Sequence, residues 1–249
     1  MALLERLTNR VRYVLNQPWS IRRGFGVPRT SGVTLVNGGV ELVATMLYAD
    51  LADSTLLATY ADPKVAAKVI KVFLGPVCDI IREHAGDIRS FDGDRVMGVF
   101  IGPNRNDRAV RAALHINQAM HFVIRPAVEQ LFPGLRAAGF LLHHGVGIDE
   151  GQVMAVRAGV RDHNDLAWIG RAPNVAAKLS AIRDSQHSVL ITNPVFQDLS
   201  WPMRMSPDGS LPIWTTRNWP SAPAPEVATV YGTAWGHPLP QARGLRRSI

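Results

Sequence analysis

The chain has 249 residues, of which 47% are hydrophobic and 19% are charged, and its formal net charge is +7. This composition is typical of a globular protein with a large core, and no apolar run approaches the roughly 18 residues of a membrane helix, which excludes a transmembrane segment. The positive charge would attract polyanions, but no Lys/Arg stripe is interleaved with aromatic residues, so direct nucleic-acid binding is not expected. Charged residues interrupt segment 1–15, which argues against a signal peptide, and the lone Cys78 excludes an internal disulfide. We therefore expect a cytoplasmic protein.

Residues 1–38 are predicted to form an amphipathic helix followed by a linker. Within 2–15, apolar residues recur at helical spacing with basic residues between them. We expect this helix to pack on the domain or on a partner subunit; the alternative is a membrane surface. Segment 17–39 is rich in Pro and Gly, as linkers are.

In residues 39–185, strands are predicted to alternate with helices. The predicted elements are strand 43–48, helix 62–83, strands 87–91 and 95–101, helix 107–129, strands 141–148, 153–156 and 167–169, and helix 172–183. Asp62-Pro63 supplies an N-cap and a first-turn proline to the first of these helices, and Gly75-Pro76 is expected to kink or break it. Phe122 is predicted to be a core residue of the second. The alternation indicates an α/β sandwich.

Residues 186–249 are predicted to be an extension that completes the same domain. This segment is rich in proline and also carries Trp201, Trp214, Trp219 and Trp235. It is too aromatic for a disordered linker, so we expect short strands and loops with buried tryptophans.

Two carboxylates lie where predicted strands end. Asp50 follows the strand 43–48, and Asp94 stands at an Asp-Gly-Asp corner between the strands 87–91 and 95–101. Carboxylates on neighbouring strand ends can share a pair of divalent cations, which hold phosphate oxygens in place. The pattern therefore favours a phosphoryl-transfer site, although two aspartates alone are a weak signal.

Four ordered motifs resemble the catalytic domain of class III nucleotidyl cyclases. Tyr48–Thr55 is similar to the first metal motif, Phe-x-Asp-Ile-x-Gly-Phe-Thr, and Gly93–Phe100 to the second, Gly-Asp-x-x-Met. Gly147–Gly151 is similar to Gly-Ile-His-x-Gly, and Ile169–Leu179 to a helix with Gly-x-x-Val-Asn-x-Ala-x-Arg. The resemblance implies that 39–185 is the catalytic domain, with an α+β fold in which helices flank a mixed, mainly antiparallel sheet. It also implies a head-to-tail homodimer with composite active sites.

The resemblance assigns roles to individual residues. Asp50, Asp94 and the carbonyl of Leu51 would bind two divalent cations, Mn²⁺ or Mg²⁺, and Ser54 and Thr55 would face the polyphosphate of a nucleoside triphosphate.

Asn174 and Lys178, four residues apart on one helix face, would be catalytic residues contributed by the opposite subunit. The family usually has arginine at position 178, and lysine keeps its charge but not its bidentate fork.

Departures from the family pattern bear on the substrate. Purine cyclases read the base with a Lys or Glu where this chain has Ser90, and with a polar residue where it has Ala167. Tyr48 replaces a common phenylalanine near the base, and Arg95 adds a cation next to Asp94. These features resemble the pyrimidine cyclases of the bacterial Pycsar anti-phage system. That likeness implies cyclic UMP made from UTP, or cyclic CMP, and a separate effector protein that senses it.

Other interpretations remain open at this level. The chain is alternatively an adenylate cyclase with an atypical base pocket, or an inactive cyclase fold that binds nucleotide.

Gln152 stands where some family members have a phosphate-binding arginine, for which Arg157, Arg161 or Arg171 would compensate. His143 and His144 are adjacent in a predicted strand, so we expect them to point to opposite faces rather than to share one ion. Asp149 and Glu150 are interpreted as turn acids.

Overall fold

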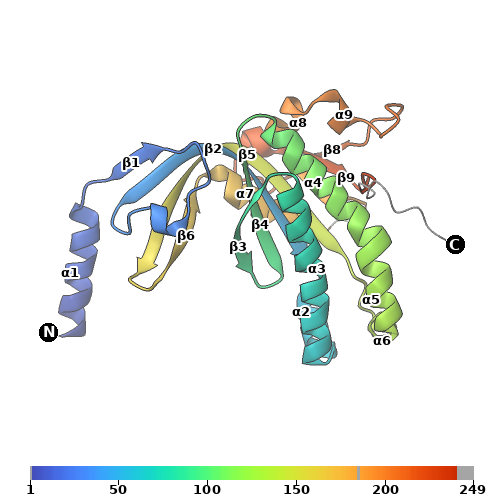
Figure 1. Cartoon of the computed structure of the whole chain (residues 1–249), viewed down its shortest axis with the longest axis horizontal. Helices are drawn as coiled ribbons and strands as arrows, with labels where there is room; N and C mark the ends of the chain where they lie inside the picture. Colours follow the sequence, from blue (N-terminus) through green and yellow to red (C-terminus); the bar gives the residue numbers. More distant parts are fainter. Residues whose placement is uncertain (1, 184–185, 240–249) are drawn as a thin grey trace, which may run out of the picture.

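The computed structural model describes residues 2–183 and 186–239, and a nine-stranded sheet forms the centre of this part of the chain (Figure 1). Its strands are β1 (Ser20–Arg23), β2 (Gly38–Leu51), β3 (Asp87–Asp92), β4 (Arg95–Ile101), β5 (His144–Val160), β6 (His163–Ile169), β7 (Val189–Thr192), β8 (Thr215–Asn218) and β9 (Thr229–Thr233). The helices are α1 (Leu3–Asn16), α2 (Ser54–Tyr60), α3 (Pro63–Glu83), α4 (Arg105–Ala119), α5 (Arg125–Leu131), α6 (Pro133–Ala137), α7 (Arg171–Ser180), α8 (Asn193–Asp198) and α9 (Trp201–Arg204).

The sheet has the order β3-β4-β2-β5-β7-β9-β8, with β1 paired to β2 and β6 paired to β5. The pairs β2–β4, β2–β5, β3–β4, β5–β6, β7–β9 and β8–β9 are antiparallel, whereas β1–β2 and β5–β7 are parallel. This confirms the expected mixed, mainly antiparallel sheet. Because β7, β8 and β9 belong to it, the proline-rich segment is part of the same sheet.

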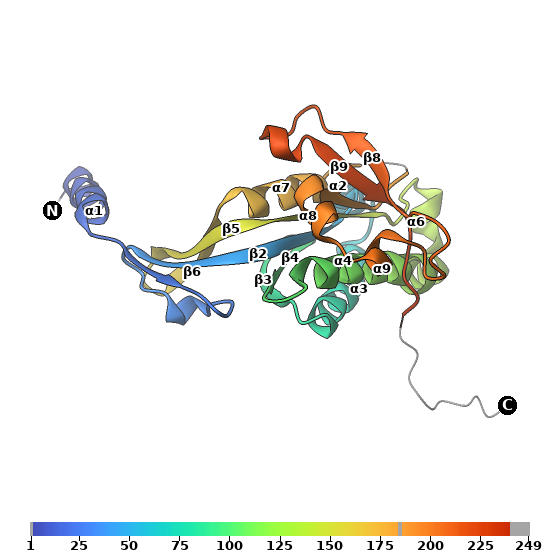
Figure 2. The ribbon, with the colours of Figure 1, turned by 90° about the horizontal axis from the view of Figure 1, so that it is seen from above.

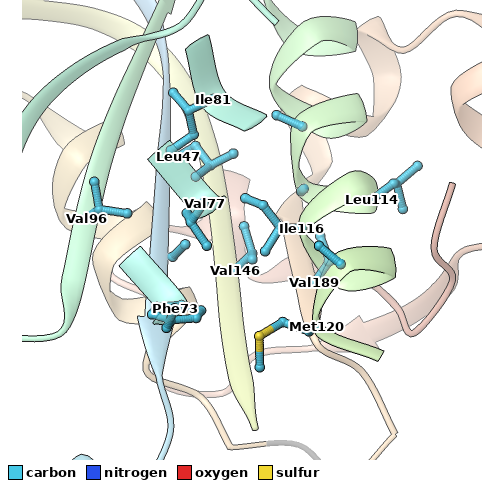
Figure 3. Packing of buried hydrophobic residues seen from close by; sticks show 14 of the residues in the cluster. Leu47, Phe73, Val77, Ile81, Val96, Leu114, Ile116, Met120, Val146 and Val189 are labelled. Atoms are coloured by element: carbon cyan, nitrogen blue, oxygen red, sulfur yellow. The ribbon is translucent and has the colours of Figure 1, made fainter. Parts of the chain in front are cut away.

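Alternating residues of β2 belong to two different cores, and α7 lies on one side of the sheet while α3 and α4 lie on the other (Figure 2). Leu47, Ala49 and Leu51 belong to a core shared with α3 and α4, part of which is drawn in Figure 3. Ala44 and Met46 belong to a second core, which includes residues of α7. Such period-two alternation is what a strand covered on both faces requires.

Three local predictions need correction. Of the kink or break expected at Pro76, the break is excluded: helix α3 is continuous through the proline, because an apolar stripe on both sides of it is packed in the core. β5 is one strand through Gly151, because β2 pairs with it along the whole of that stretch. Phe122 is 71% exposed, since a π turn (η2, Met120–Ile124) follows α4 and shifts which residues face the core.

The N-terminal helix has no buried residue and projects away from the sheet (Figures 1 and 2). It therefore does not pack on the described part of its own chain, and packing on a partner subunit remains the prediction. None of the described helices is both long and apolar enough to cross a membrane. Of the C-terminal tryptophans, Trp219 is buried, but Trp201 and Trp235 are exposed, so burial was wrongly predicted for those two.

Candidate active site

The two aspartates are brought together by strand pairing. Asp50 is the penultimate residue of β2 and lies opposite Arg95, the first residue of β4. Asp94 immediately precedes Arg95 in the two-residue turn between β3 and β4, in which Gly93 has the left-handed φ of 62°. A glycine adopts this conformation without steric cost, so the turn is tight and holds Asp94 next to the end of β2.

A cavity of about 900 Å³ opens at this corner. Its lining residues are Asp50, Leu51, Asp53, Ser54, Thr55, Leu56, Thr59, Asp92, Gly93, Asp94, Arg95 and Arg183. Six of the site residues that we predicted from the sequence therefore line this one cavity. The other five, Tyr48, Ser90, Ala167, Asn174 and Lys178, do not line it.

The electrostatics of the corner fit a divalent cation. Asp94 Oδ2 is buried and has no hydrogen-bond partner among the described residues. Burial raises the pKa of Asp50, and the neighbouring Asp94 carboxylate adds to that effect, whereas Arg183 opposes it. No group of three His, Cys, Asp or Glu side chains in the described part of the chain could hold a metal ion. A cation here would therefore be bound by two carboxylates, with the Leu51 carbonyl and phosphate oxygens as further oxygen ligands.

Arg183 is a residue of this corner that sequence reasoning missed. Its Nη2 donates to Asp50 Oδ2 at 2.7 Å, and its Nη1 donates to the carbonyl of Ser180 at 2.8 Å. The sequence placed Arg183 at the end of a helix, but α7 ends at Ser180, which leaves Arg183 in the following loop. No motif marks it; its distance of 133 positions from Asp50 makes the contact purely tertiary.

Tyr48 and Ser90 lie in one row across three strands. Both are register partners of Met97 on β4, one from β2 and the other from β3. The guanidinium of Arg95 lies 5.4 Å from the centre of the Tyr48 ring and is also bonded to Asp92. Burial raises the pKa of the Tyr48 hydroxyl, although Arg95 opposes this, so Tyr48 remains a neutral donor at neutral pH. This row adjoins the cavity through Arg95.

The remaining predicted residues lie elsewhere. Ala167 is on β6, opposite Val156 of β5. Asn174 and Lys178 are both exposed on α7, and Asn174 Nδ2 donates to the carbonyl of Gly170 at 3.0 Å. Their spacing puts them on one helix face, as predicted, but within one chain that face does not line the cavity.

Comparison with known proteins gives the family. No family model matches the chain. Uridylate cyclases that resemble it include one from Rhodovulum sp., which is 39% identical and aligned over 88% of this chain and 91% of its own length. Those from Burkholderia cepacia (36%; 88% and 93%) and Xanthomonas perforans (34%; 94% and 98%) are similar. The chain belongs to the uridylate cyclase family.

Solved structures show the same fold. A guanylyl cyclase crystal structure superposes with a TM-score of 0.66 at 20% identity, over 80% of this chain and 95% of the other. A bacterial light-regulated adenylyl cyclase gives 0.65 at 21% identity, over 93% of this chain and 62% of the other. The class III cyclase fold expected from the motifs is thus confirmed, and with the family membership the chain is a nucleotidyl cyclase.

In this cyclase, helix α7 is fixed to the sheet by a buried ion pair. Arg171, its first residue, donates through Nε to Asp149 of β5 at 3.1 Å and through Nη1 to Glu226 at 3.0 Å. Asp149 is fully buried and also accepts from Thr192 at 2.6 Å. The interpretation of Asp149 as a turn acid is therefore wrong, since β5 continues through it. Arg171 is already engaged by these carboxylates, which makes it a poor substitute for a phosphate-binding arginine.

Proposed function

We propose that this cyclase converts a pyrimidine ribonucleoside triphosphate, preferably UTP, into the 3′,5′-cyclic monophosphate and diphosphate. The observation that carries the proposal is the cavity in which Asp50 and Asp94 converge at a tight strand corner. Asp94 Oδ2, which is buried and has no hydrogen-bond partner in the described part of the chain, is an acceptor that a cation would satisfy. The names of the related uridylate cyclases support the choice of nucleotide.

Two divalent cations, Mn²⁺ or Mg²⁺, would be held by Asp50, Asp94 and the Leu51 carbonyl. When bound, such cations neutralise the triphosphate and lower the pKa of the ribose 3′-hydroxyl. Ser54 and Thr55, in the first turn of α2, would position the polyphosphate at the same end of the cavity. The reaction is an in-line attack of the 3′-oxygen on the α-phosphorus with loss of diphosphate.

The base would lie against the row formed by Tyr48 and Ser90. The Tyr48 hydroxyl and the Arg95 guanidinium are hydrogen-bond donors, and a pyrimidine offers carbonyl oxygens as acceptors. Ser90 and Ala167 lack the charged or longer side chains with which purine cyclases read their bases. A purine would leave its edge groups poorly matched, which selects against ATP and GTP.

The active unit is a head-to-tail homodimer. Asn174 and Lys178 are exposed and lie outside their own cavity, so they would act in the cavity of the opposite subunit. There they would stabilise the charge that develops on the transferred phosphoryl group. The sedimentation coefficient of the purified protein tests for the dimer.

The biological role follows from the resemblance to pyrimidine cyclases of anti-phage defence. The cyclic nucleotide is made in the cytoplasm on phage infection and is sensed by a separate effector protein. Cells that carry the gene and its effector are then protected from phage, and cells with an inactive cyclase are not.

The decisive assay supplies the purified protein with Mn²⁺ and each of the four ribonucleoside triphosphates in turn. Conversion of UTP well above ATP and GTP is expected, with CTP as the next substrate. Dominant CTP turnover would make it a cytidylate cyclase, and dominant ATP turnover an adenylate cyclase with an atypical pocket. Nucleotide binding without turnover of any of the four would reduce it to an inactive nucleotide-binding module.

A further inference from the structure

A second cavity, of about 450 Å³, adjoins the catalytic one. Its lining residues are Ala52, Asp53, His121, Arg125, His143, His144, Ile182, Arg183, Gln186, Ser188 and Ala234. Asp53 and Arg183 line both cavities. Nothing in the proposed cyclisation uses the imidazoles that surround this second space.

Arg125 is the fixed centre of the basic side chains. Its Nε donates to the carbonyl of Leu142 at 2.9 Å, which holds the guanidinium in place. Its Nη1 lies 3.4 Å from Nδ1 of His121, and its Nη2 lies 3.4 Å from Nδ1 of His143. A guanidinium only donates, so both Nδ1 atoms accept, and the proton of each neutral imidazole is on Nε2. Each ring therefore retains an N–H donor that Arg125 does not use.

His144 supplies an independent indication of a ligand. The residue is 7% exposed, lines the cavity, and its Nε2 has no hydrogen-bond partner among the described residues. Buried polar atoms in native proteins are nearly always satisfied by protein, water or an ion, so Nε2 of His144 can take a partner from the cavity. The expectation that His143 and His144 both lie in a strand is wrong, because β5 begins at His144; His143 is exposed, His144 is buried, and both residues line the cavity.

The charge of the lining favours an anion over a cation. Arg183 is already paired with Asp50, but Arg125, which lies between His121 and His143, has no ion-pair partner among the described residues and supplies the uncompensated positive charge. Burial, with Arg125 adding to it, lowers the pKa of His121 and His143, so these rings are neutral donors at pH 7. A metal cation does not suit the site, because the Arg125 guanidinium lies between the two imidazoles that would have to bind it.

We propose that this cavity is a binding site for a phosphate-class oxyanion, separate from the nucleotide site. Arginine forks match tetrahedral oxyanions well, and several imidazole donors plus the Ser188 side chain can serve the remaining oxygens. The source of the anion is either free phosphate or the diphosphate that the proposed reaction releases. Binding of the anion itself does not depend on the proposed cyclisation.

The test is calorimetric titration of the purified chain with inorganic phosphate and with diphosphate, at pH 7 in EDTA so that no metal is present. Saturable binding of at least one is expected, and tighter binding of diphosphate identifies the leaving group as the source. Arg125→Gln should weaken binding by at least tenfold, whereas Arg136→Gln, which removes an exposed arginine of α6, should leave it unchanged. No saturable binding, or equal binding of acetate, overturns the proposal.

Two further variants distinguish anion binding in this cavity from anion binding in the catalytic cavity. Asp94→Asn alters only the catalytic cavity, so this variant must still bind the anion even if turnover is lost. If the variant no longer bound the anion, the binding site would be the catalytic cavity. His143→Gln removes one imidazole donor at the rim, while the bond from Arg125 to the Leu142 carbonyl still anchors the guanidinium, and circular dichroism checks that the variant folds. Weaker binding by folded His143→Gln supports the assignment, and unchanged binding contradicts it.

Discussion

The corner of β2 and β4 and the exposed face of α7 carry different halves of one proposed site. The corner is recessed, contains a cavity, and holds a buried carboxylate oxygen with no hydrogen-bond partner in the described part of the chain. The α7 face is exposed, and the side chain of Asn174 on it donates to the carbonyl of Gly170 one turn earlier. The first half can bind a charged ligand, whereas the second does not line the catalytic cavity of its own chain.

This difference has a consequence for assembly. Arg171 joins α7 to the sheet through its bonds to Asp149 and Glu226, and the α7 face does not line the cavity of its own chain. In the proposed head-to-tail dimer, the two halves meet when a second copy brings its α7 face to the corner. We therefore predict that a substitution in either half abolishes or lowers turnover, and that two chains damaged in different halves regain activity when they form a heterodimer.

The largest effect is expected from the corner itself. Asp94→Asn removes a cation ligand while keeping the shape of the side chain, and turnover should fall by at least about 10³-fold, since cations supply several kcal/mol of transition-state stabilisation. Calorimetric Mn²⁺ binding should weaken in the same variant. Asp162→Asn, in the exposed turn between β5 and β6, is the matched control and should keep both properties. If Asp94→Asn turned over UTP at the wild-type rate, the assignment of Asp94 as a metal ligand would be wrong.

The next effect tests whether the halves belong to different subunits. Asn174→Ala should lose about 10²-fold in turnover, as expected for one transition-state donor. A heterodimer of Asp94→Asn with Asn174→Ala, isolated by two affinity tags, has one fully intact site and should regain about half of the wild-type rate per dimer.

The control for complementation pairs Asp94→Asn with Asp50→Asn. Both changes lie in the same half-site, so each of the two sites in this heterodimer is damaged and no activity should return. Equal recovery in both heterodimers, or in neither, would contradict the division of the site between two chains.

A smaller loss of turnover is expected when Lys178, the basic residue on the exposed face of α7, is replaced. Lys178→Ala should lower turnover by about 10-fold to 10²-fold, because it removes charge stabilisation without removing the donor Asn174. Lys178→Arg should keep most activity, since the charge is retained and a bidentate fork is added. The exposed Lys71→Ala on α3 is the control, and steady-state kinetics with UTP give the readout. A Lys178→Ala enzyme with unchanged kinetics would make this lysine an ordinary surface residue.

The corner half was predictable from sequence in two steps. The strand pattern and the Asp-Gly-Asp turn signal placed Asp50 near the end of β2 and Asp94 just before β4. The resemblance to the cyclase motifs then joined the two aspartates, which are far apart in the chain, into one site. Arg183 was not predictable, since its contact with Asp50 depends on where α7 ends and how the helix lies on the sheet.

Other misses have equally specific causes. Hydrophobic periodicity does not reveal a π turn, and that turn is why Phe122 is exposed. The composition of the Asp149–Gly151 stretch is typical of a turn, but pairing with β2 keeps it extended. In the Asp149–Gly151 stretch, a tertiary constraint overrode a local preference.

Both half-sites depend on the same sheet. The smallest expected effect is a change in the stability of that fold with pH. Burial, with His84, His237 and Arg111 adding to it, lowers the pKa of His115 on α4 from 6.5 to about 4. A histidine with a depressed folded pKa resists protonation, so its stabilising contribution is complete above pH 6.5 and is lost as the pH falls toward 4; at most about 3 kcal/mol is at stake. Urea unfolding between pH 7 and 5 should show this loss, and His115→Gln should flatten it. The exposed His163→Gln should not, because that side chain lies on β6 outside the core. If the complementing heterodimer lost its activity at pH 5.5 while its free energy of unfolding was unchanged, acid would be acting on the contact between the two subunits rather than on the sheet. The sheet would then not be the support that both half-sites share.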